Sequence, residues 1–222
     1  LWRAQWPYWA VTMLYVVLVR HMLHQAVVES PVRGMGTQVW TQIKGLTYYL
    51  KLLVVPYPLS VAHPFSLSHG VAEGTVIGGF LLLLSIGILL WFFVLRGIDR
   101  SGVFWMMWPF VTLLPTLVVP LNVLVNEHRL YISSIALAIV AALLVSRYWH
   151  NHPVLTGSIV MLLAISFALH DRARVGVWQS PQTLWEDAVK KGPTMPRPHI
   201  YLGDGLKESG RHEEALQFYY TA

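Results

Sequence analysis

The chain contains apolar segments long enough to cross a membrane, and these constrain its fold more than any other feature. A membrane-spanning helix needs about 20 mainly apolar residues. Three segments reach roughly that length, at about 7–28, 75–95 and 103–125, and two shorter ones follow at about 130–146 and 154–169. The sequence therefore predicts an all-α fold in which residues 1–170 form a polytopic bundle of about five transmembrane helices.

The composition also indicates a membrane protein. Of the 222 residues, 55% are hydrophobic and 12% are charged, whereas roughly a quarter of the residues in soluble domains are charged. The net charge is +5, but no basic cluster with interleaved aromatic residues accompanies it, so we predict membrane lipids and no nucleic acid as partners. The chain has no cysteine, which excludes disulfides and thiolate metal sites.

A long connection separates the first two apolar segments. Its middle part, about residues 42–55, is amphipathic, with Lys44 and Lys51 suited to lipid headgroups and Leu52 and Leu53 suited to the lipid interior. We predict an interfacial or re-entrant helix over these residues, followed by a proline-rich loop.

The composition changes after residue 170, because about half of the charged side chains lie in the last quarter of the chain. Within this tail, Ala188 and Ala222 occupy equivalent positions 34 residues apart, and 34 residues is the period of the tetratricopeptide repeat. The residues that fit the packing positions of this repeat are Leu202, Gly203, Leu206, Gly210, Ala215, Tyr219 and Ala222. Residues 171–222 are therefore predicted to be the soluble start of a helical repeat domain, a fold that binds protein partners.

Charges near the apolar segments predict the orientation. Arg3, Arg96, Arg100 and Arg147 lie at alternate ends of the five segments, and positive charge favours the cytoplasmic side. The sequence therefore predicts an integral protein of the inner, plasma or endoplasmic reticulum membrane. Its repeat tail and the turn at 126–129 are expected on the extracytoplasmic side.

Two stretches, VVPLNVLVNEHRLYISSIALAIVAALL and YYLKLLVVPYPLSVAHPFS, carry a family resemblance. They resemble the Glu-Arg-Leu-Tyr-x-Pro-Ser-x-Gly and Tyr-Leu-x-x-Leu-x-x-Pro-x-x-Leu-Ser motifs of polytopic membrane proteins with C-terminal tetratricopeptide repeats. That group contains the transmembrane-and-TPR O-mannosyltransferases, which are similar to GT-C glycosyltransferases. The resemblance implies a polyprenyl-phosphate sugar as donor substrate, with no further cofactor evident.

In the first of these stretches the chain departs from the family pattern at three positions. His128 is inserted between Glu127 and Arg129, Ser133 stands where the relatives have Pro, and Ala136 stands where they have Gly. The resemblance also implies that the acidic catalytic residue of GT-C enzymes lies upstream of this chain. Catalytic residues therefore stay unassigned, and whether the chain acts as an enzyme stays open.

Three ionisable residues interrupt the apolar sequence at Glu127, His128 and Arg129. A guanidinium at a membrane boundary suits a phosphate, so one interpretation is a site for the donor phosphate formed by Arg129, Glu127, Tyr131 and His63. The alternative is a structural pair of Glu127 and Arg129 that ends one helix and anchors the next. The spacing does not separate the two.

The histidines are predicted to bind no metal. They occur in pairs, such as His63 with His69 and His150 with His152, and neither pair has a third ligand at metal spacing.

Two functions follow from these patterns. In the first, the chain is the C-terminal part of a GT-C-like membrane glycosyltransferase, and its repeats bind a protein partner or acceptor. In the second, it is a non-catalytic structural or assembly subunit of a larger membrane complex, in which other subunits are partners and the repeats are an interaction module.

Overall fold

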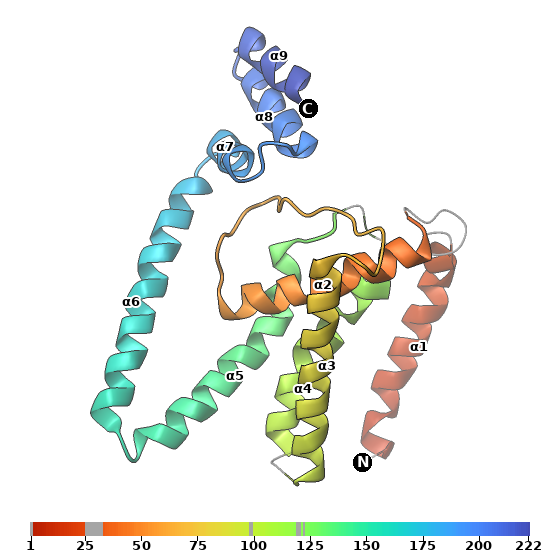
Figure 1. Cartoon of the computed structure of the whole chain (residues 1–222), viewed down its shortest axis with the longest axis vertical. Coiled ribbons are helices and arrows are strands. Elements are labelled where there is room, and N and C mark those ends of the chain that lie inside the picture. The colour runs from red at the N-terminus through yellow and green to blue at the C-terminus, as the bar shows by residue number, and fades with distance from the viewer. Residues whose placement is uncertain (1, 25–32, 98–99, 119–120, 122) are drawn as a thin grey trace.

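The computed structural model describes residues 2–24, 33–97, 100–118, 121 and 123–222, and these residues form helices joined by loops (Figure 1). The helices are α1 (Trp2–His24), α2 (Met35–Val54), α3 (Gly74–Leu95), α4 (Arg100–Val118), the short 3₁₀ helix η2 (Glu127–Arg129), α5 (Leu130–Trp149), α6 (Pro153–Val177), α7 (Pro181–Lys191), α8 (Pro196–Glu208) and α9 (His212–Thr221). No strand occurs within the described ranges. The predicted all-α fold is therefore confirmed.

Three helical segments are long and apolar enough to cross a membrane, among the residues that the structure describes. They are Gly74–Leu95, Glu127–Trp149 and Pro153–Val177. Their apolar side chains are mostly exposed, as Leu81, Ile88 and Leu162 illustrate at 57%, 61% and 67%. Apolar faces of this extent need a lipid or protein environment, which supports membrane insertion of these three helices. That α1 and α4 also span the membrane stays a prediction.

The long helices run between two opposite ends of the molecule (Figure 1). The N-terminus, the end of α3 and the α5–α6 turn lie at one end. At the other end lie α2, the loop 55–73, η2 and α7–α9. We call this second end the α2 end. Helix α2 lies across the bundle there and contacts α3, α4 and α5.

Several helix boundaries differ from the sequence prediction. Helix α3 matches it within one residue, whereas α4 ends at Val118 instead of continuing to residue 125. Helix α6 continues to Val177, so the boundary predicted after residue 170 falls inside a helix. Helix α2 begins at Met35 instead of residue 42. Residues 25–28 of the first predicted span lie outside the described residues.

A small core joins α2 to α4 and to the segment before η2. Leu46, Tyr49, Leu113 and Val125 form it, and each is at most 7% exposed. A polar contact joins α4 to α5 beside it, where the Thr112 and Ser133 hydroxyls lie 2.7 Å apart. Phe65 of the loop 55–73 also packs against this core, which holds the loop at the α2 end.

Helices α8 and α9 of the tail pack against each other as a helical hairpin. Leu202, Leu206 and Ala215 form its core and are each at most 2% exposed. Gly203 allows the two helices to approach, because a Cβ atom there would lie 2.6 Å from Cε1 of Tyr219. Gly210 has φ +78° in the turn between the helices, a conformation that glycine adopts without strain.

The remaining two predicted packing positions differ from each other. The Tyr219 hydroxyl donates a hydrogen bond to Asp204 Oδ1 at 2.7 Å, so this residue joins the two helices. Ala222 follows the last helix and is exposed, so the structure assigns it no packing contact.

Candidate functional site

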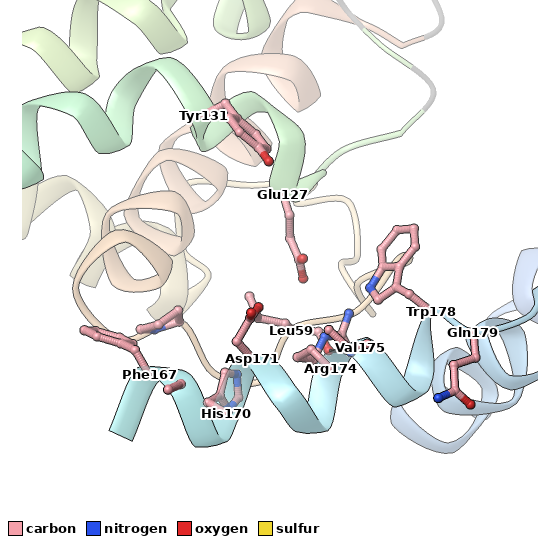
Figure 2. A pocket seen from close by; sticks show the side chains of 12 residues that line it. Leu59, Glu127, Tyr131, Phe167, His170, Asp171, Arg174, Val175, Trp178 and Gln179 are labelled. Carbon is pink, nitrogen blue, oxygen red and sulfur yellow. Dashed lines mark hydrogen bonds between the residues drawn. The ribbon is translucent and has the colours of Figure 1, made fainter. Parts of the chain in front are cut away.

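An open cleft lies at the α2 end of the bundle, between α6, the start of the loop 55–73 and the beginning of α5. Its volume is about 850 Å³. Pro56 and Leu59 contribute from the loop, and Glu127 and Tyr131 from η2 and the first turn of α5. Figure 2 shows the carboxylates of Glu127 and Asp171 directed into the space between opposite walls. The cleft therefore has ionisable groups inside an otherwise apolar lining.

One face of α6 forms the longest wall. Phe167, Asp171, Arg174 and Trp178 line the cleft, and their spacing of three or four residues places them on the same side of a helix. The apolar part of this face continues away from the cleft along α6, where Leu163 is 53% exposed. The cleft is therefore continuous with the exposed apolar surface of a helix that is long and apolar enough to cross a membrane.

Glu127 is held in a defined position at the cleft wall. Its Oε1 atom accepts a hydrogen bond from the backbone N–H of Ser60 at 2.5 Å. The same oxygen lies 3.0 Å from Nε2 of His63. The Glu127 side chain keeps 24% exposure. Two donors thus fix one carboxylate oxygen, and the group remains partly open to the cleft.

His63 stands behind Glu127 and is itself buried, with a side chain 1% exposed. Its Nδ1 atom lies 3.0 Å from the hydroxyl of Tyr48. The neutral tautomer with its proton on Nε2 satisfies every partner, because the Tyr48 hydroxyl then donates to Nδ1 and Nε2 donates to Glu127. Tyr48, His63 and Glu127 therefore form a continuous hydrogen-bonded chain that ends at the cleft.

Electrostatics favour the hydroxyl form of Tyr48. Burial raises its pKa above the ordinary value, and the negative charge of Glu127 adds to the increase. A tyrosine with a raised pKa stays protonated at neutral pH and remains a donor to His63. Tyr48 can therefore serve as the hydrogen-bond donor to Nδ1 of His63 at neutral pH.

Arg129 lies on the other side of η2 and uses its guanidinium within the protein. Its Nη1 atom donates to the Tyr49 hydroxyl at 3.2 Å and to the Leu124 carbonyl at 3.1 Å, and Nη2 donates to the Val123 carbonyl at 2.9 Å. Arg129 therefore braces the segment before η2 against α2. This arrangement differs from a direct pair with Glu127, whose oxygen is held by Ser60 and His63.

The buried Tyr49 hydroxyl is predicted to contribute measurably to stability. It accepts from the Asn126 backbone N–H at 2.9 Å and from Arg129, and the residue is 0% exposed. Tyr49→Phe leaves both donors without this acceptor, so we expect about 1–3 kcal/mol of lost stability in thermal unfolding of the purified protein. Tyr220→Phe is the control, since Tyr220 is 86% exposed. Equal stability of both variants would contradict the bracing role.

Arg174 connects the cleft wall to the tail. Its Nη1 atom donates to the Leu59 carbonyl at 3.0 Å and to Asp187 Oδ2 at 3.1 Å. Lys191 bonds the same two oxygens at 2.6 Å. The Arg174 Nη2 atom is buried with no hydrogen-bond partner, as is Nε2 of His170, another residue of the lining. The polar end of the cleft thus contains two buried nitrogen atoms without a hydrogen-bond partner.

The structure separates the residues that the sequence grouped together. Glu127 and Tyr131 line the cleft, His63 supports Glu127 from behind, and Arg129 points into the protein. The α6 residues Asp171 and Arg174 were missed. Their helical spacing with Phe167 was visible in the sequence, but the span prediction ended before them. Within the described ranges, no group of three His, Asp or Glu residues comes together in a way that could hold a metal ion.

Comparison of the chain with protein families, with curated proteins and with solved structures finds no match.

Proposed function

We propose that this chain is the C-terminal part of a GT-C-like membrane glycosyltransferase that takes its sugar from a polyprenyl-phosphate donor. The observation that carries the proposal is the amphiphilic cleft beside α6. Its apolar wall continues onto a candidate spanning helix, and its polar end holds Glu127, Asp171 and Arg174. A lipid-linked phosphate has the same combination of a long apolar chain and a charged head.

Each part of the cleft has a role in this proposal. The prenyl chain lies along Phe167 and the exposed face of α6, and the phosphate approaches the guanidinium of Arg174 where it lines the cleft. Guanidinium groups bind phosphate through directional, charge-assisted hydrogen bonds. The Trp178 ring, 56% exposed, offers a surface on which a sugar can stack. The proposal departs from the GT-C pattern at one point: it takes Glu127, and not an acidic residue upstream of this chain, as the group that accepts the proton of the attacking hydroxyl, because its carboxylate is held in place and partly open to the cleft.

The tail completes the proposed protein. Helices α7–α9 would be the beginning of a tetratricopeptide repeat domain that binds the acceptor or another protein partner. The proposal also takes α1 and α4 as spans, which gives five crossings and places the tail on the same, extracytoplasmic, side as the cleft.

Binding of a polyprenyl phosphate to the purified chain tests the proposal. We expect Arg174→Gln to weaken this binding at least about tenfold, because charge-assisted hydrogen bonds contribute about 1.5–3 kcal/mol each. Arg172→Gln is the matched control, since Arg172 is exposed on the same helix outside the cleft lining. Asp187→Asn removes the partner of Arg174 but keeps the cation, so it separates loss of binding from loss of the α6–α7 connection. Equal affinity of wild type and Arg174→Gln would refute the role of this arginine.

The second candidate is a structural subunit of a membrane complex. It is favoured by the apolar surface at the last helix, where Leu216 and Tyr220 are 51% and 86% exposed. Such a surface suits a further repeat or a partner protein. A chain that binds no polyprenyl phosphate and co-purifies with membrane partners would favour this function.

A further inference from the structure

A second cavity lies between α2 and the beginning of α3, and the proposed function does not use it. Its volume is about 570 Å³. Helix α2 contributes Lys44, Thr47 and Lys51, and α3 contributes Thr75 and Leu82. The two lysines are seven residues apart and therefore share one face of α2. The cavity thus combines two cations and two hydroxyl groups with an apolar wall.

Lys44 is partly buried in the cavity wall, where a bound anion would favour its charged form. Its Nζ atom donates to the Ser66 carbonyl at 2.7 Å and to the Ser66 hydroxyl at 3.3 Å, and it lies 4.8 Å from the centre of the Phe65 ring. Burial lowers the pKa of Lys44, and the negative charge of Glu73 partly opposes this effect. An additional anion would offset the cost of the buried charge.

Lys51 is the more accessible of the two cations. The residue is exposed, and its Nζ atom lies 5.6 Å from the centre of the Tyr48 ring. An exposed lysine above an aromatic ring keeps its remaining donors available for a ligand.

The position of the cavity selects the kind of anion. Thr75, Gly78 and Leu82 belong to the first turns of α3, one of the candidate spans. The end of a span lies at the depth of the lipid headgroups. Beyond the cavity the same face of α3 is apolar and exposed, as Leu89 illustrates seven residues after Leu82, with 50% exposure. An anion bound here would therefore have acyl chains alongside α3.

From this arrangement we infer that the α2–α3 cavity binds the phosphate headgroup of an anionic phospholipid. Lys44 and Lys51 neutralise the phosphate, the Thr75 hydroxyl lies in the same lining, and the acyl chains follow α3. The lipid holds the amphipathic helix α2 against the membrane surface and against α3. This inference is independent of the glycosyltransferase proposal, because it uses neither the α6 cleft nor Glu127.

The test measures binding of phosphatidylglycerol to the purified chain by native mass spectrometry, with phosphatidylcholine as the zwitterionic comparison. We expect preference for phosphatidylglycerol and at least about tenfold weaker binding in Lys44→Gln/Lys51→Gln, since each lysine near an anionic lipid contributes roughly a factor of five. Lys190→Gln/Lys207→Gln is the matched control: it removes the same charge from exposed positions in the tail and should bind as wild type does.

Two further measurements keep the result interpretable. Lys44→Arg/Lys51→Arg retains both charges and should retain binding, which separates loss of charge from loss of folding. Inorganic phosphate at millimolar concentration should not displace the lipid. Unchanged lipid binding in the Gln variant, equal loss in the tail control, or displacement by inorganic phosphate would each overturn the inference, the last by showing a site for a free anion.

Discussion

Glu127→Gln is expected to lower sugar transfer by the intact protein at least about 100-fold, while binding of a polyprenyl phosphate changes little. Under the proposed function, Glu127 accepts the proton of the attacking hydroxyl, and general base catalysis contributes about 10²–10⁴-fold in rate. A glutamine keeps an oxygen that can accept from Ser60 N–H and His63 Nε2, the two groups that hold Oε1. The substitution therefore removes basicity and leaves the hydrogen-bonded chain in place.

The assay measures transfer of a labelled sugar from its polyprenyl phosphate to the acceptor. Binding of the donor is determined on the same preparations. Glu213→Gln is the control, because Glu213 is exposed on α9 and remote from the cleft lining. Full activity of Glu127→Gln would exclude Glu127 as the proton acceptor. Absence of transfer in the wild-type protein, together with absence of donor binding, would favour the structural subunit instead.

Gly203→Ala is expected to destabilise the tail by about 1–3 kcal/mol relative to Gly205→Ala. Both glycines lie in α8, and alanine improves helix propensity by a similar amount at each. The difference is in the space that a Cβ atom would enter. At Gly203 it would lie 2.6 Å from Cε1 of Tyr219, whereas at Gly205 nothing lies within 4 Å. Overpacking a fitted contact costs about 1–3 kcal/mol.

Thermal unfolding and limited proteolysis of the tail measure this difference. Gly205→Ala should be neutral or slightly stabilising, and Gly203→Ala should expose the α8–α9 hairpin to protease. A shifted Tyr219 would also lose its 2.7 Å hydrogen bond to Asp204. Equal stability of the two alanine variants would contradict the close packing of α8 on α9.

The fold was predictable where one local signal was sufficient. The α3 prediction agrees within one residue because its 22 residues are apolar and lack charge and proline. The α4 prediction was too long because the apolar average continues past Val118, and proline does not mark this end, since the helix also contains Pro109 and Pro115. The α6 prediction was too short for the opposite reason: hydropathy falls at Asp171, but the helix continues to Val177. Gly210 was predictable because its turn requires a conformation that suits glycine.

The site was predictable only in part. Glu127 was recognisable as an ionisable group among apolar residues, but its partner His63 is 64 positions away along the sequence. That contact depends on how the loop 55–73 passes over α2, which no local pattern determines. The sequence also suggested a pair of Glu127 and Arg129, whereas their side chains leave η2 toward different partners. These partners depend on how the loop and the helices pack, so the folded structure is needed to identify them.

The central claim is that the α6 cleft receives the polyprenyl-phosphate donor, and photocrosslinking tests it most directly. The purified chain is illuminated with a polyprenyl phosphate that carries a photoreactive group next to the phosphate, and the modified residues are identified by mass spectrometry. The account predicts adducts on Leu59, on Tyr131 and on residues 174–178 at the end of α6, all of which unlabelled polyprenyl phosphate suppresses. Adducts confined to the α2–α3 cavity, or adducts that the unlabelled lipid does not suppress, would contradict it.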